Sequence, residues 1–98
     1  VARLFWDEGR YPQARDWFTK TVQAARTWGD GWAWWYAFEG TQPDGDAQRR
    51  QLLDKIELAE PKEGDVWTHL REKPEFAACS LRTLLPVAAD EVIKQESD

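Results

Sequence analysis

The segment 29–39 of this chain reads GDGWAWWYAFE and holds three of its seven tryptophans. The opening of the segment recurs further along, because GDGW at 29–32 is matched by GDVW at 64–67, which places Trp32 and Trp67 35 positions apart. A self-match near this spacing is typical of helical-hairpin repeats, in which each unit completes its apolar core against its neighbours. The sequence therefore predicts a stack of helical hairpins.

The segment itself is predicted to be a helix that is buried on two faces. Gly29 is expected to end the preceding helix, and Asp30 is expected to cap the new one by accepting a backbone N–H. An inner helix of a repeat array packs against both its own partner and the next unit, which explains the many aromatic residues. At helical spacing, one face carries Trp32, Trp35, Tyr36 and Glu39, and a second carries Trp34 and Phe38.

Periodic apolar residues predict a helix on each side of this segment. The first begins with the Tyr-Pro pair at 11–12, because proline is tolerated at the first helical position. The second runs to about Glu60, where Pro61 prevents its continuation. The apolar stripes are Ala14, Trp17, Phe18, Thr21, Val22 and Ala25 in the first helix, and Leu52, Leu53, Ile56 and Ala59 in the second.

The two ends of the chain are expected to be less regular. Residues 2–8 are predicted to form the end of a helix. A short helix from Val66 should finish before Pro74, because the residue before a proline avoids helical geometry. A last helical region is expected from about 75 to 95, and Pro86 inside it should kink it or split it in two.

Length and composition favour a single domain with acidic character. The 98 residues carry a net charge of −5, and residues 51–98 hold six Lys or Arg against eleven Asp or Glu. This half argues against nucleic acid as a direct ligand, since phosphate binding needs clustered positive charge.

The single cysteine rules out an internal disulfide and suits a reducing compartment. No segment resembles a signal peptide or a membrane span. The chain opens on Val1, and we expect a fragment of a longer protein.

The first two hairpins resemble known helical-repeat families. At 9–21 a glycine, a tyrosine, an alanine, an aromatic and a small residue stand at the spacings of a tetratricopeptide repeat. The segment 29–39 is more similar to the half-a-tetratricopeptide (HAT) variant, which has Trp, then an aromatic, then Glu along its first helix. Its second helix opens with Ala-Arg followed by an aromatic, as at 14–18. The signature residues are Ala14, Arg15, Phe18, Trp32, Trp35, Tyr36, Glu39, Pro61 and Trp67.

The HAT resemblance implies an all-α fold, a right-handed α-α superhelix of helical hairpins. Its units would be a first repeat at 1–28, a second at 29–63, and a degenerate third at 64–98 that includes a C-terminal capping helix. Terminal repeats are expected to be atypical because one side faces water. The family pattern also implies that Glu39 is a structural acceptor between helices.

HAT repeats are familiar from RNA-processing assemblies, and the pattern is similar to the C-terminal repeats of scaffolds in the spliceosomal tri-snRNP. The resemblance implies a non-catalytic protein–protein scaffold in pre-mRNA splicing, located in the nucleus, with spliceosomal snRNP proteins as partners and no cofactor. Two alternatives remain open. One is direct RNA binding by the repeats, and the other is generic peptide binding of the tetratricopeptide type.

Few residues in the sequence point to catalysis. His69 and Cys79 are the sole histidine and the sole cysteine, and no Asp or Asn accompanies them in a recognisable orienting role. Cys79 is interpreted as a small buried hydrophobe on the last helix. A structural zinc site needs four ligands of these types, so no metal is expected.

The binding alternatives depend on a few exposed candidates. RNA bases could stack on Trp28 or Trp34, but core packing is preferred because the neighbouring residues are acidic or small. The adjacent pair Arg49 and Arg50 is interpreted as part of a solvated helix face. A peptide clamp needs several basic residues on the first helices of successive repeats, and Arg71 is the single candidate there.

Overall fold

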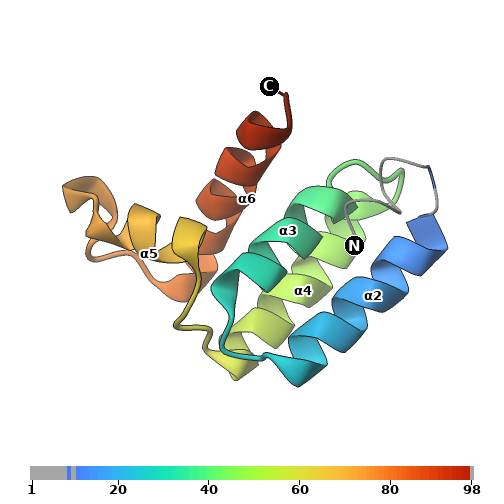
Figure 1. The fold of residues 1–98 in the computed structure, drawn as a ribbon, viewed down its shortest axis with the longest axis horizontal. Helices are drawn as coiled ribbons and strands as arrows, with labels where there is room; N and C mark the ends of the chain where they lie inside the picture. Colours follow the sequence, from blue (N-terminus) through green and yellow to red (C-terminus); the bar gives the residue numbers. More distant parts are fainter. Residues whose placement is uncertain (1–8, 10, 98) are drawn as a thin grey trace.

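The computed structural model describes residue 9 and residues 11–97, so the helix expected over 2–8 lies outside the described residues. This part of the chain contains five α-helices and one short 3-10 helix, arranged as Figure 1 shows. The helices are α2 (Tyr11–Ala24), α3 (Gly29–Glu39), α4 (Gly45–Ala59), α5 (Asp65–Glu72), the 3-10 helix Pro74–Phe76 and α6 (Leu81–Ser97).

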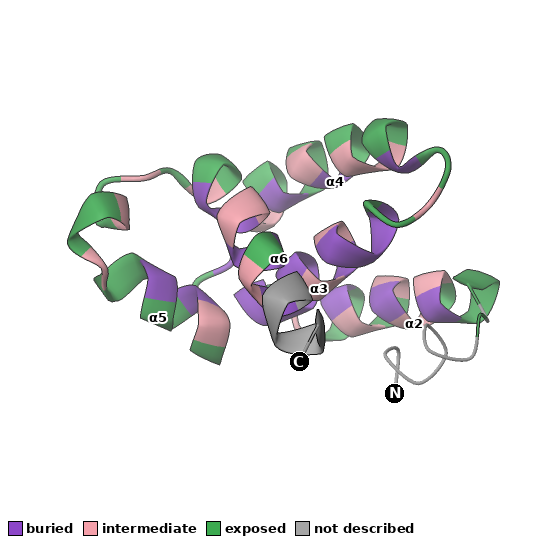
Figure 2. Ribbon diagram, turned by 90° about the horizontal axis from the view of Figure 1, so that it is seen from above, coloured by how far each residue is buried: buried purple, intermediate pink, exposed green. Residues whose placement is uncertain are grey.

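Helix α3 lies at the centre of the molecule. It contacts α2, α4, α5 and α6, and its largest interface is with α6. Figure 2 shows that most of α3 is buried, whereas α2 and α4 each bury one side and expose the other. Apart from one isolated bridge, the described residues contain no β-structure. The predicted all-α helical-repeat fold is confirmed.

The core joins the apolar stripes of all five helices. The burial of apolar area stabilises a fold by about 25 cal/mol per Å2. In α2 every fourth residue of the predicted stripe is buried, from Ala14 to Val22, and in α4 Leu52 and Ile56 of the predicted stripe are buried. The buried hydrophobic residues are Ala14, Phe18, Val22, Trp32, Ala33, Trp35, Ala37, Phe38, Leu52, Ile56, Trp67, Leu70, Leu84, Leu85, Ala88, Ala89 and Val92.

The linker before α3 and the linker before α5 lie side by side. Trp28 and Glu63 form a parallel β-bridge. The carbonyl of Thr27 accepts hydrogen bonds of 2.8 Å from the N–H groups of both Lys62 and Glu63, and the carbonyl of Glu63 accepts one of 2.5 Å from Gly29. Each of these linkers leads into a GDxW sequence. The pairing of the linkers therefore brings the two GDxW sequences next to each other.

The start of α3 differs from the prediction. Helix α2 already ends at Ala24, and Gly29 is the first residue of α3 instead of the end of the preceding helix. Trp28 occupies the N-cap position without a side-chain cap hydrogen bond. Asp30 therefore does not cap its own helix, and its carboxylate instead accepts hydrogen bonds from the start of α5.

The C-terminal part also differs from the prediction. A 3-10 helix and a turn come first, so that α6 begins at Leu81 and not near residue 75. The helix continues past Pro86 to Ser97, and the prediction of a split helix is wrong. A proline inside a helix costs about 3 kcal/mol through its missing N–H and its ring. Packing against α3 offsets this cost, because five residues of α6 are buried: Leu84, Leu85, Ala88, Ala89 and Val92.

Candidate functional site

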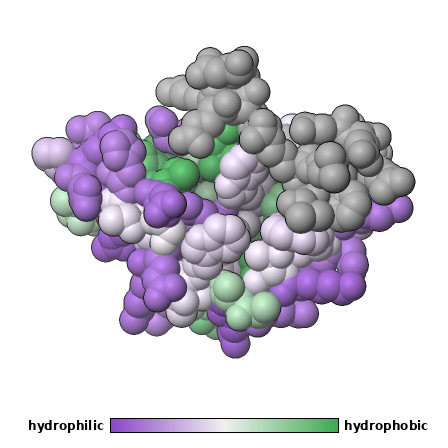
Figure 3. All heavy atoms as spheres, in the orientation of Figure 1, coloured by the Kyte–Doolittle hydropathy of each residue, from purple (hydrophilic) through white to green (hydrophobic). Residues whose placement is uncertain are grey.

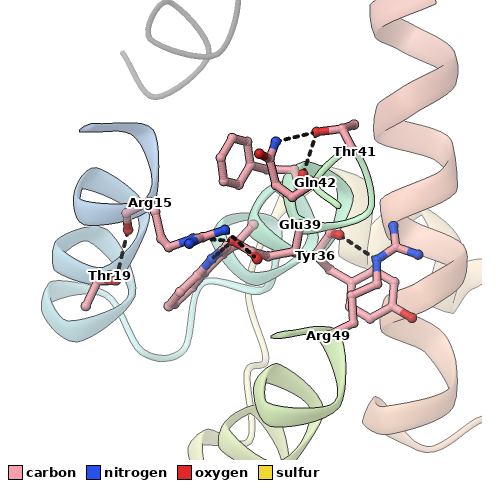
Figure 4. Close-up of polar contacts among 9 residues, drawn as sticks. Arg15, Thr19, Tyr36, Glu39, Thr41, Gln42 and Arg49 are labelled. Carbon is pink, nitrogen blue, oxygen red and sulfur yellow. Dashed lines mark hydrogen bonds and ion pairs between the residues drawn. The ribbon is translucent and has the colours of Figure 1, made fainter. Parts of the chain in front are cut away.

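A buried carboxylate joins α2 to α3. Glu39, at the end of α3, is 1% exposed and accepts hydrogen bonds from Arg15 Nε to Oε1 at 2.8 Å and from Arg15 Nη2 to Oε2 at 3.2 Å. Trp35 Nε1 donates to the same Oε1 at 3.3 Å (Figure 4). Burial of a carboxylate is costly unless it is paired, and the planar guanidinium matches both of its oxygens. Glu39 thus lies between helices as an acceptor, held by groups from both.

Aromatic rings extend this contact along α2 and α3. Phe18 of α2 stacks on Trp35 of α3 at 6.4 Å between centroids and 6° between planes, and it also meets Phe38 at 5.4 Å. Trp35 in turn stacks on Trp32 at 6.0 Å and 13°. Trp32 Nε1 donates to the carbonyl of Arg26 at 3.0 Å, so its polar atom is satisfied. These rings make the α2–α3 junction a continuous aromatic layer.

A second buried carboxylate joins α3 to α5. Asp30 is 6% exposed, and its Oδ2 and Oδ1 accept hydrogen bonds from the backbone N–H groups of Val66 at 3.2 Å and Trp67 at 3.0 Å. These N–H groups belong to the first turn of α5, where no helical carbonyl is available to them. Asp30 therefore caps α5. Asp65, its counterpart in the second GDxW sequence, is exposed.

Close backbone approach at this junction requires glycine at two positions. A Cβ atom on Gly29 would lie 2.9 Å from Cγ of Trp67 and 3.0 Å from the carbonyl of Glu63. Gly64 has φ of 132°, and a Cβ atom there would lie 2.4 Å from Oδ1 of Asp30. The recurring glycine before each aspartate thus lets the two helix starts meet, and Trp67 packs directly over the start of α3.

Arg49 of α4 makes a polar contact with α3. Its Nε donates to the carbonyl of Tyr36 at 2.9 Å, and its guanidinium lies 4.1 Å from the centroid of the Tyr36 ring (Figure 4). The interpretation of Arg49 as part of a solvated face is therefore wrong, although Arg50 is exposed. The carbonyl of Tyr36, which also accepts the backbone N–H of Gly40 at 3.2 Å, is thus a second acceptor for the cation, and this tertiary contact is not indicated by sequence spacing.

The other predicted residues occupy varied positions. Ala14 and Pro61 are buried, and Pro61 follows Glu60, whose φ of 49° ends α4. Trp28 and Trp34 are half-buried, and Trp34 packs against the core. The nine residues of the HAT signature do not form one site, since Arg15 and Glu39 lie in the α2–α3 junction and Trp67 in the α3–α5 junction.

Sequence reasoning missed the role of Asp30 and of Arg49. The repeated GD pair was a signal for Asp30. It marks the starts of two equivalent helices, and an acid at one start can reach the free N–H groups of the other when the two starts lie close together. No comparable signal marks Arg49, which is one of two adjacent arginines on an exposed stretch of α4.

Residues with catalytic potential do not converge in the described part of the chain. His69 is exposed on α5, whereas Cys79 is half-buried in the turn before α6, so its assignment to the last helix is wrong. No group of three or more His, Cys, Asp or Glu residues there could hold a metal ion. Arg82 donates a hydrogen bond to Asp54, and this bond together with the negative charges of Asp54 and Glu57 raises the pKa of Arg82. No helix among the described residues has the length and apolar character needed to cross a membrane.

Several curated proteins are similar to this chain, whereas no family model matches it. Pre-mRNA-processing factor 6 of Homo sapiens is 39% identical over 67 residues, which are 68% of this chain and 7% of that protein. Protein STABILIZED1 of Arabidopsis thaliana is 32% identical over 97 residues, 99% of this chain and 9% of that protein. Pre-mRNA-splicing factor prp1 of Schizosaccharomyces pombe is 34% identical over 88 residues, 90% of this chain and 10% of that protein.

The matched region is a small piece of each relative. The chain spans a tenth or less of the length of these proteins, but the matches cover between two thirds and almost all of the chain itself. The resemblance inferred from the sequence is thereby confirmed. The chain is similar over most of its length to a segment of the Pre-mRNA-processing factor 6 proteins, and its stacked helices are consistent with a HAT-repeat region of that kind.

Proposed function

We propose that this chain is a non-catalytic scaffold segment of a pre-mRNA splicing factor, and that it bridges protein components of the tri-snRNP in the nucleus. The similarity to relatives named as pre-mRNA processing and splicing factors supports the splicing role. We further propose that the units are 1–28, 29–63 and 64–98, and that the segment comes from the C-terminal repeats of its parent protein.

The observation that carries the proposal is that both buried carboxylates of the described chain accept hydrogen bonds from other helices of the same chain. Glu39 and Asp30 are buried carboxylates, and each is engaged with groups of a neighbouring helix. Buried carboxylates open to a ligand would instead be candidates for chemistry. Here they fix the relative positions of α2, α3 and α5, which is what a stiff protein scaffold requires.

The exposed surface is consistent with a scaffold that binds proteins through selected positions. The face drawn in Figure 3 is mainly hydrophilic or neutral, with small hydrophobic patches between helices. The net charge of −5 does not favour a phosphate backbone as ligand. Arg71, the single candidate for a peptide clamp, lies 5.8 Å from the ring of Trp67, so it is part of an intramolecular contact.

Crosslinking mass spectrometry on the assembly purified through the parent protein tests the scaffold. Lys62 and Lys73 are suitable reporters because they lie outside the core. The scaffold predicts crosslinks from these lysines to snRNP proteins. Their restriction to the parent protein itself would contradict it. RNA binding by the isolated chain with sub-micromolar affinity at near-physiological salt would instead favour the RNA-binding alternative.

A further inference from the structure

A groove lies between the C-terminal ends of α2 and α4, beside the beginning of α3. It has a volume of about 330 Å3, close to the lower end of the roughly 300–1,000 Å3 range of ligand pockets. We call it the α2–α4 groove. Its lining residues are Val22, Gln23, Arg26, Trp32, Lys55, Leu58 and Ala59.

The floor of the groove is fixed in place. Val22 is 5% exposed and Trp32 is 4% exposed, and both belong to the core. The indole of Trp32 is held by its hydrogen bond to the carbonyl of Arg26 and by its stacking on Trp35. A rigid apolar floor favours binding, because the protein loses little conformational freedom when a side chain enters.

The rim carries an apolar side chain for which the fold has no evident use. Leu58 is 81% exposed and is the most exposed large hydrophobic residue in the described part of the chain. It lies off the buried stripe of α4, where Leu52 and Ile56 fill the core. A single exposed leucine is ordinary. Beside an apolar groove, however, it extends the surface that a partner can cover.

Two cations flank the apolar surface. Within the described part of the chain, neither Arg26 nor Lys55 forms an ion pair with a carboxylate, although Lys55 Nζ lies 5.6 Å from the ring of Trp35. The acids nearest to Lys55 in sequence, Asp54 and Glu57, are bound to Arg82 of α6. The groove is therefore bordered by unpaired positive charge on a chain whose net charge is negative.

We propose that the α2–α4 groove binds a short acidic segment of a partner protein, with one large apolar side chain against Trp32 and Leu58 and acidic residues beside Arg26 and Lys55. This inference rests on the proposed scaffold function and names the chemistry of one partner. Charge complementarity selects the acidic flanks and steers association, whereas the apolar anchor supplies most of the affinity.

Selection from a phage-displayed library of random 12-residue peptides on the immobilised 98-residue chain tests the proposal. We expect enrichment of sequences with Leu, Phe or Trp flanked by Asp and Glu. Binding of an enriched peptide, labelled with fluorescein, should weaken about tenfold or more in Leu58→Asp. It should also weaken as salt rises from about 0.1 M to about 1 M, since the Debye length falls from about 10 Å to about 3 Å.

Two control variants separate the groove from general charge effects. Gln51→Asp adds the same negative charge to the same helix at an exposed position outside the groove, and it should bind the peptide as the unchanged chain does. The double variant Arg26→Glu, Lys55→Glu should select basic flanks in place of acidic ones, whereas Arg50→Glu should not. Urea unfolding of every variant verifies that the fold is retained, which is expected because Leu58 is exposed.

The outcomes distinguish the two proposals. A failure to enrich acidic apolar peptides, or their equal binding to Leu58→Asp, overturns the groove assignment. The assignment is also overturned if single-stranded oligouridine binds the chain, loses affinity in the Arg26→Glu, Lys55→Glu variant and keeps its affinity in Leu58→Asp. Such a result would identify the groove as a nucleic-acid site. If a parent protein carrying Leu58→Asp keeps all its crosslinks to snRNP proteins, the groove proposal fails and the scaffold stands. If the unchanged parent shows no such crosslinks, the scaffold fails.

Discussion

The junction between α3 and α2 and the junction between α3 and α5 are held together by different kinds of contact. The α2–α3 junction is made of side chains, with stacked rings around the ion pair between Arg15 and Glu39. The α3–α5 junction combines the buried ring of Trp67 with a close backbone approach, in which Asp30 and two glycines bring the helix starts together. The comparison teaches that one repeat motif can make both kinds of contact, because its Glu lies at one end of the helix and its Asp at the other.

The largest effect is expected where an aromatic side chain is fully buried. Trp67 is 0% exposed in the α3–α5 junction, and Trp67→Ala should lower the free energy of unfolding by about 3–5 kcal/mol. That is a large share of the roughly 5–15 kcal/mol that stabilises a typical domain. Chemical denaturation measured by circular dichroism provides the test. Trp67→Phe is the control, and it should cost less, because the indole N–H is buried without a partner in the described structure.

At the α2–α3 junction, the sharpest test is to leave the buried carboxylate without its cation. Arg15→Ala should cost about 1.5–3 kcal/mol, because among the described residues Glu39 would keep only the indole N–H of Trp35 as a donor. Urea denaturation of Arg15→Ala, Glu39→Gln and the double variant gives the coupling energy between the two residues. A coupling near zero would show that the rings hold this junction without the ion pair.

A smaller effect is expected from removal of the cap that Asp30 supplies to α5. Asp30→Ala should cost about 1–2 kcal/mol and speed hydrogen exchange at the amides of Val66 and Trp67. Asp65→Ala is the matched control, because this acid stands at the equivalent repeat position but is exposed. Equal effects of the two substitutions would contradict the assignment of the cap to Asp30.

The smallest effect is expected at the contact between α4 and α6, which lies outside both junctions. Arg82 forms ion pairs of 3.1 Å with Asp54 and 3.2 Å with Glu57, but all three side chains are solvent-accessible. Arg82→Ala should leave the midpoint of urea denaturation almost unchanged, because exposed pairs contribute little and are screened by salt. A clear loss of stability that persists at high salt would show that this contact is structural.

Much of the fold followed from local patterns. The stripe through Ala14, Phe18 and Val22 predicted the buried face of α2, and the recurrence of Trp32 at Trp67 predicted a stack of helical hairpins. The helix boundaries predicted from the sequence were less accurate than the predicted buried faces. The split that was one of the two outcomes expected at Pro86 does not occur, because a local rule about hydrogen bonds does not include the apolar area that the rest of α6 buries against α3.

The functional surface was less predictable than the core. Lys55 and the exposed Leu58 are distant in sequence from Val22, Arg26 and Trp32, and each of these residues by itself looks like an ordinary surface or core residue. Their convergence depends on how the ends of α2 and α4 lie beside the beginning of α3. No periodicity within one helix contains that information.

The sequence alone determined that this protein is a helical repeat, because the 3.6-residue period and the repeated GDxW pattern are properties of the chain itself. Tertiary structure decided which buried charge serves which helix, and where a groove with unpaired cations lies on the surface. The physical reason is that helix formation depends on neighbours within one or two turns, whereas pairing of a carboxylate and the shape of a groove depend on groups that only packing brings together.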